Sequence, residues 1–155
     1  MVIYITIRNM ANFLASAYCE YLRWNKYIDF CDYTKHFSPQ DASWFDVFQR
    51  LIIDNPNIEF KVFNFEGFKK DKPKLIESIS FGKITNFNEN IQPSRQKFSQ
   101  SELTLISGCQ VSDNKKNNSF QPFEADIVQL CNEKLNQDLL LFRQLPNVKI
   151  INDVE

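Results

Sequence analysis

The sequence predicts an α/β fold in which a mostly parallel sheet is flanked by helices in three layers. Residues 2–7 and 58–65 are rich in β-branched and aromatic side chains, as strands are. The first segment is followed by a stretch in which apolar side chains recur at helical spacing, and the second by a loop and a further predicted helix. Residues 2–7 are also nearly uncharged, which is typical of a parallel strand that is buried on both faces.

Length and composition predict one domain, residues 1–155. A hydrophobic content of 43% and a charged content of 24% are values of globular proteins. The formal net charge of −1 argues against nucleic acid or a membrane surface as a partner. No segment is long enough for a membrane span. The cysteines lack metal-ligand spacing, and we interpret them as reduced thiols of a cytoplasmic protein: Cys19, Cys31, Cys109 and Cys131.

The stretch 2–24 contains the first candidate binding residues. After the strand, Arg8 lies at the carboxyl end, the edge at which open parallel sheets bind ligands. A guanidinium matches the oxygens of phosphate or sulfate in pairs, and Ser16 in the following helix adds a hydroxyl. Alternatively, Arg8 ends the strand in solvent and Ser16 packs against a neighbour. The helix, from residue 11 to 24, is expected to bury Phe13, Leu14, Ala17, Tyr18, Tyr21 and Leu22.

The later elements follow from periodicity and turn residues. Ser38 and Pro39 give a helix-start signal before an apolar helix that extends to Asp54. On this helix Trp44 is interpreted as core, with the lining of an acceptor pocket as the alternative. Further helices are expected at residues 74–80, 96–107 and 124–145, a loop at 66–73, a mobile polar loop at 110–121, and a short edge strand at 148–151. The last helix is expected to bury Ile127, Leu130, Cys131, Leu135, Leu139 and Phe142.

The pattern Arg8-Asn9, Asn12, Ser16-Ala17-Tyr18 resembles the 3'-phosphate segment of the sulfotransferase superfamily. The chain departs from that pattern at Met10 and Asn12, where proline and aspartate are usual. The resemblance implies a P-loop-NTPase-like fold and the cofactor 3'-phosphoadenosine 5'-phosphosulfate (PAPS). It implies that Arg8 and Ser16 hold the 3'-phosphate of PAPS or of the product adenosine 3',5'-bisphosphate.

A second resemblance covers residues 58–80, where the strand is followed by an acidic residue, a loop and a helix. In sulfotransferases a tyrosine after this strand lies near the adenine, and Phe65 occupies its place. The resemblance further implies adenine contacts from the loop that contains Thr85 and Phe87. Arg95, before the next helix, is a second candidate anion ligand, although a surface arginine near a helix start is the commoner explanation.

The resemblance implies transfer of a sulfuryl group to a hydroxyl or amine of a small-molecule or carbohydrate acceptor. The chain resembles the C-terminal portion of such a domain, without the preceding phosphate-binding loop, and we expect it to be inactive alone. The exposed edge of strand 2–7 predicts dimerisation. No catalytic residue is assigned, since the lone histidine, His36, is more simply incidental. The alternative is a non-catalytic globular protein that acts through interactions.

Overall fold

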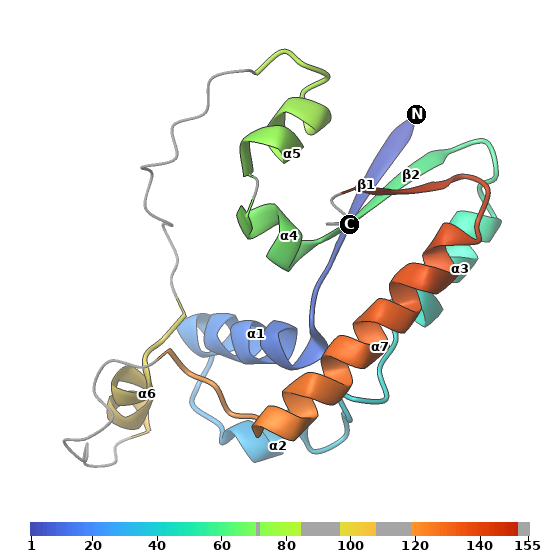
Figure 1. Ribbon diagram of the computed structural model, residues 1–155. Coiled ribbons are helices and arrows are strands. Elements are labelled where there is room, and N and C mark those ends of the chain that lie inside the picture. Colours follow the sequence, from blue (N-terminus) through green and yellow to red (C-terminus); the bar gives the residue numbers. More distant parts are fainter. Residues whose placement is uncertain (71, 85–96, 108–118, 152–155) are drawn as a thin grey trace. The chain divides into compact units, whose positions relative to one another are not determined.

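The computed structural model describes residues 1–70, 72–84, 97–107 and 119–151 (Figure 1). Their contacts divide the chain into two units. The sheet unit combines residues 1–8, 43–91 and 132–155, and the helical unit combines residues 9–42 and 92–131. Each unit has its own apolar core.

The sheet unit contains a parallel sheet of three strands in the order β1-β2-β3 among the described residues. The strands are β1 (Val2–Ile7), β2 (Glu59–Asn64) and β3 (Val148–Ile151). Ile5 pairs with Val62, which in turn pairs with Ile150, so β2 is central. Figure 1 shows the three strands side by side. The α/β class, the two predicted strands and the short edge strand are therefore confirmed.

One face of this sheet carries the core of the unit. Ile5 and Ile7 of β1 and Phe60 and Val62 of β2 point to the same face because side chains alternate along a strand. Helices α3 (Trp44–Ile53) and α7 (Ala125–Arg143) cover it. The helical members of the cluster are Ile52, Leu135, Leu139 and Phe142, with Trp44, Phe45 and Phe48 packed against it. Trp44, interpreted as core, is partly buried and packs against this cluster.

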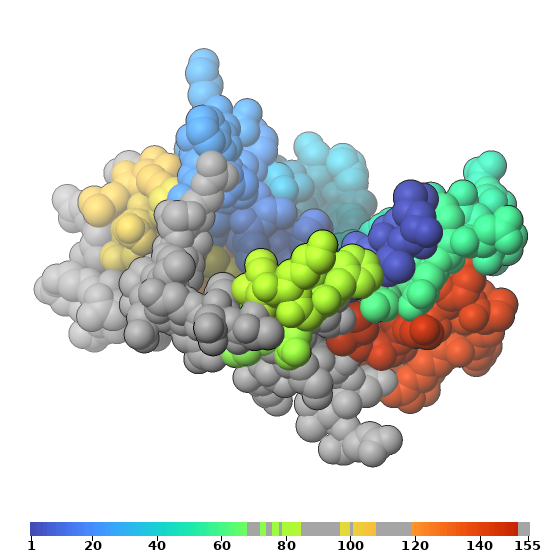
Figure 2. All heavy atoms as spheres, turned by 90° about the horizontal axis from the view of Figure 1, so that it is seen from above, coloured from blue at the N-terminus to red at the C-terminus, as the bar shows by residue number. Residues whose placement is uncertain are grey.

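The expectation that β1 is buried on both faces is wrong. Its burial alternates, with Ile5 and Ile7 buried and Thr6 between them exposed. The strand also lies at the edge of the described sheet, where it pairs only with β2. Met1, which precedes this strand, is 82% exposed, and Figure 2 shows the amino-terminal atoms (blue) on the surface.

Two element boundaries in the sheet unit differ from those expected. Helix α3 begins at Trp44 with Ser43 as its N-cap, later than the Ser38-Pro39 signal indicates. The expected loop after β2 is instead helix α4 (Phe65–Lys70), followed by α5 (Lys72–Ile79). The side chain of Asn64 accepts the backbone N–H of Glu66 at 3.0 Å, a local bond that satisfies a donor at the start of α4.

The helical unit packs α1 (Met10–Trp24), α2 (Phe30–Thr34) and α6 (Gln100–Ile106) around a second cluster. Its buried members are Ala15, Tyr18, Cys19, Leu22, Leu103 and Phe120. The stripe expected on α1 is rotated, because Phe13 is 40% exposed while Ala15 and Cys19 are buried. Small side chains at these positions allow close packing, a role that a count of large apolar residues misses. Phe120, expected in a polar loop, is also buried.

Helix α7 belongs to both units, with residues up to Cys131 in the helical unit and those from Asn132 in the sheet unit. Its expected stripe is confirmed at Cys131, Leu135, Leu139 and Phe142, whereas Leu130 is 46% exposed. None of the helices in the described ranges is both long and apolar enough to cross a bilayer. In the same ranges no cluster of histidine, cysteine and acidic side chains has the composition of a metal site.

Candidate functional site

Arg8 and Phe65 leave neighbouring strands at the same edge of the sheet. Ile7, the last residue of β1, pairs with Asn64, the last residue of β2, so the next residue of each strand emerges beside the other. The guanidinium carbon of Arg8 lies 4.6 Å from the centroid of the Phe65 ring. A cation over an aromatic face at this distance is attracted by the ring quadrupole. Two of the residues predicted to bind nucleotide therefore lie in contact.

Arg8 has an acidic neighbour that the sequence did not predict. Its Nη2 lies 3.5 Å from Oε1 of Glu66, in a pair whose side chains are 15% and 39% exposed, respectively. Burial lowers the pKa of Arg8, and the charge of Glu66 and its hydrogen bond oppose that shift. The guanidinium stays protonated, because the ordinary pKa of arginine lies far above neutral pH. The site thus presents a largely buried cation beside a half-exposed carboxylate.

A buried carboxylate fixes the backbone of Arg8 indirectly. Asp138 of α7 is fully buried and accepts two hydrogen bonds, from Oγ of Ser43 at 2.7 Å and from the backbone N–H of Trp44 at 2.6 Å. The indole N–H of Trp44 then donates to the carbonyl oxygen of Arg8 at 2.7 Å. The start of α3 and the end of β1 are therefore held together through side chains of the sheet unit.

We expect Asp138→Asn to lower the free energy of unfolding by about 1–2 kcal/mol, the scale of weakening a hydrogen bond to a charged acceptor. The amide of asparagine has one oxygen, which can accept from either Ser43 or the backbone N–H of Trp44, and its NH₂ group then faces the other donor. Urea denaturation of the variant and of Glu133→Gln, an exposed change of the same charge on the same helix, measures the effect. Equal losses in the two variants would contradict a special role for the buried carboxylate.

Ser16 lies in α1 of the helical unit, where it is half-buried, whereas Arg8 belongs to the sheet unit. Their joint contact with one phosphate stays a prediction. Asn9, between them, has a structural role: it is 1% exposed, accepts from the N–H of Asn12 at 3.1 Å as N-cap of α1, and donates to the carbonyl of Val128 at 2.9 Å. Asn12, the second asparagine of the pattern, therefore donates its backbone N–H to the side chain of Asn9.

The other predicted nucleotide ligands, Thr85, Phe87 and Arg95, lie outside the described residues. His36 is exposed between α2 and α3. Among the six predicted ligands, the structure therefore brings together Arg8 and Phe65.

No protein-family model, curated protein or solved structure matches the chain.

Proposed function

We propose that the chain is sulfotransferase-like and binds the 3'-phosphate of PAPS or adenosine 3',5'-bisphosphate through Arg8. The observation that supports this proposal is the contact of Arg8 with Phe65 at the carboxyl ends of two parallel strands. Each residue was assigned to the nucleotide from a separate segment of the sequence. Open parallel sheets bind their ligands at this edge.

The chemistry of Arg8 suits a phosphate. Its guanidinium is held in a sheltered position over an aromatic ring, where a charged hydrogen bond to a phosphate is strengthened by partial exclusion of water. Glu66 is a weak competitor, because a 3.5 Å contact with a half-exposed carboxylate contributes little in water. An incoming phosphate can replace this contact with paired hydrogen bonds.

The wider proposal extends to the full nucleotide and the reaction. Ser16 and Arg95 would add to the anion site, and Phe65, Thr85 and Phe87 would contact the adenine. PAPS would supply the sulfuryl group, and a hydroxyl or amine of a small molecule or carbohydrate would accept it. A three-layer, P-loop-like sulfotransferase fold, a cytoplasmic location and dimerisation through the β1 edge belong to the same proposal.

Titration calorimetry with two nucleotides tests the proposal. Adenosine 3',5'-bisphosphate and adenosine 5'-monophosphate differ only in the 3'-phosphate, so the difference in their affinities reports recognition of that group. We expect the bisphosphate to bind at least about tenfold more tightly, the effect of one charged hydrogen bond. Equal affinities, or no binding of either, would favour the alternative of a non-catalytic interaction protein.

Replacing Glu66 by glutamine is expected to tighten binding of the bisphosphate about two- to fivefold, because it removes a half-exposed charge that pairs with Arg8 and repels a phosphate. The same titration measures this change. Glu77→Gln, an exposed substitution on α5, is the matched control and should leave the affinity unchanged. Weaker binding in Glu66→Gln would mean that this carboxylate contacts the nucleotide itself.

We expect no sulfuryl transfer by this chain alone. Stabilising a transferring group needs several aligned donors, and loss of one costs about 10²–10³ in rate. Neither of the glycines that the structure describes lies in a glycine-rich loop: Gly67 lies in α4, and Gly82 has a φ of 74° without a second glycine beside it. Gly108 lies outside the described residues. Labelled PAPS with carbohydrate, phenol and amine acceptors provides the assay. Turnover that is lost in Arg8→Ala would overturn this expectation.

A further inference from the structure

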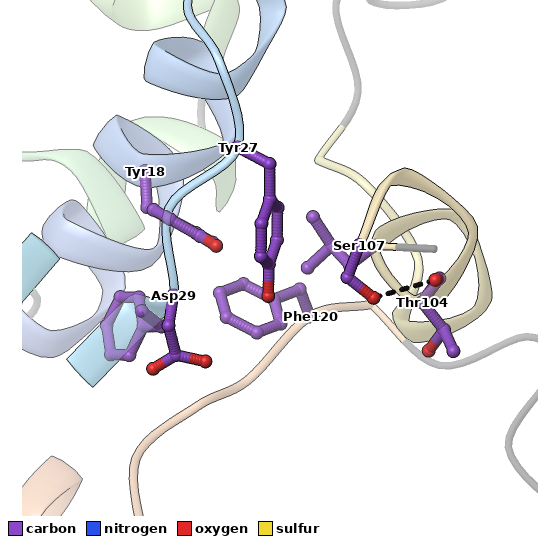
Figure 3. Close-up of a pocket in the computed structure, with 8 residues that line it drawn as sticks. Tyr18, Tyr27, Asp29, Thr104, Ser107 and Phe120 are labelled. Atoms are coloured by element: carbon purple, nitrogen blue, oxygen red, sulfur yellow. Dashed lines mark hydrogen bonds between the residues drawn. The ribbon is translucent and has the colours of Figure 1, made fainter. Parts of the chain in front are cut away.

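The helical unit contains a pocket of about 140 Å³ that the proposed nucleotide site does not use. Figure 3 shows side chains that line it from α1, from the start of α2 and the segment before it, from the end of α6, and from the segment before α7. The lining residues are Tyr18, Tyr27, Asp29, Phe30, Leu103, Thr104, Ser107 and Phe120.

Aromatic rings form much of the wall. The ring centroids of Tyr18, Phe30 and Phe120 lie 5.1 to 5.6 Å from one another, so the three rings support one another in tilted and edge-on contacts. Tyr27, 42% exposed, adds a fourth ring at the mouth. Aromatic faces carry negative potential and attract cations.

Two of the hydroxyls that line the pocket have their protons engaged by backbone carbonyls. The hydroxyl of Tyr18 donates its proton to the carbonyl of Ile28 at 2.7 Å, and that of Ser107 donates to the carbonyl of Thr104 at 2.8 Å. A hydroxyl whose proton is engaged in this way can act toward a further partner only as an acceptor. The Tyr18 hydroxyl also makes a hydrogen bond with the side chain of Tyr27. Burial raises the pKa of Tyr18, so that its phenol stays neutral.

Asp29 is the one charged side chain among the lining residues. One of its carboxylate oxygens accepts the backbone N–H of Cys31 at 2.8 Å as N-cap of α2, which fixes the side chain beside the rings. A carboxylate, π faces and acceptor oxygens disfavour an anion and favour a positively charged ligand. The size of the pocket limits that ligand to a compact group.

We propose that this pocket binds a small organic ammonium ion, with the aromatic rings around its alkyl groups and Asp29 as the counter-charge. The combination matches the way in which aromatic cages recognise methylated ammonium groups. The site lies within the helical unit, and its residues are separate from Arg8 and Phe65.

Choline and its neutral isostere 3,3-dimethyl-1-butanol test the charge requirement, because they differ in one atom, nitrogen or carbon. We expect choline to produce saturable shifts in the NMR spectrum of the full chain, with an affinity at least about tenfold above that of the isostere. Equal affinities would overturn the proposal, as would the absence of saturable choline binding at millimolar concentrations.

Two variants locate the site. Asp29→Asn keeps the N-cap, since asparagine caps as well as aspartate, and should weaken choline binding about tenfold. Asp32→Asn, on α2 but outside the pocket lining, is the matched control. Tyr27→Leu changes an exposed ring and should weaken choline binding about fivefold. If both Asp29→Asn and Tyr27→Leu bind choline with the affinity of the wild-type chain, choline binds elsewhere and the proposal is wrong. Arg8→Ala, which changes the proposed nucleotide site, should leave choline binding unchanged.

Discussion

Leu135→Ala is expected to lower the free energy of unfolding by about 2–5 kcal/mol, the range for removing a buried leucine side chain. Leu135 is 5% exposed and belongs to the cluster that joins α7 to β1, β2 and α3. The substitution removes apolar contacts and leaves a cavity that this close-packed cluster can only partly fill. The loss should therefore be larger than that of any surface substitution discussed above.

Leu140→Ala provides the matched control on the same helix. Leu140 is 56% exposed, so its truncation should change the free energy of unfolding by less than about 0.5 kcal/mol. Urea denaturation followed by circular dichroism measures both variants. If Leu135→Ala lowers the free energy of unfolding as little as Leu140→Ala does, α7 does not pack tightly against the sheet.

The sequence predicts most of the sheet unit because its signals are local. Residues 2–7 and 148–151 form strands at the predicted bounds, and α7 starts and ends within two residues of those expected. The burial of β1 was overestimated, because a run of β-branched residues does not reveal whether a helix covers its second face. Thr6, exposed in this strand, is the residue that shows the difference.

Other features depend on contacts between distant residues. Helix α3 begins at Trp44, where Ser43 caps it locally by accepting the N–H of Asp46 at 3.1 Å. Asp138 adds a distant partner, since it accepts from Ser43 and from the N–H of Trp44, ninety-five and ninety-four residues away, respectively. No local sequence pattern predicts the contact with Asp138. By contrast, the capping box of Ser99 and Glu102 at the start of α6 is visible in the sequence, and it would have corrected the expected start at residue 96.

The candidate site was predicted in part. Strand ends and a family resemblance pointed to Arg8 and Phe65, and the register of β1 and β2 explains their contact. Glu66 was visible as an acidic residue, but its pairing with Arg8 depends on the unpredicted helix α4. The aromatic pocket was missed because Phe120 lies far along the chain from Tyr18, in a segment whose polar composition suggested a loop.

Removing the guanidinium of Arg8 should affect a nucleotide with a 3'-phosphate and spare one without it. We expect Arg8→Ala to weaken binding of adenosine 3',5'-bisphosphate by about 1.5–3 kcal/mol, the value of a hydrogen bond between charged partners. Adenosine 5'-monophosphate lacks the group that Arg8 is proposed to hold, so its affinity should change little. The difference between the two losses isolates the interaction of one side chain with one phosphate.

Calorimetric titration of both nucleotides into the wild-type chain and Arg8→Ala measures this difference directly. Arg50→Ala, which removes the same charge from a side chain that is 91% exposed on α3, controls for the change in net charge. We predict that Arg8→Ala lowers the affinity for the bisphosphate about ten- to a hundredfold. The affinity of this variant for the monophosphate, and the affinities of Arg50→Ala for both nucleotides, should change little. Equal losses for both nucleotides, or a loss for the bisphosphate as large in Arg50→Ala, would contradict recognition of the 3'-phosphate by Arg8.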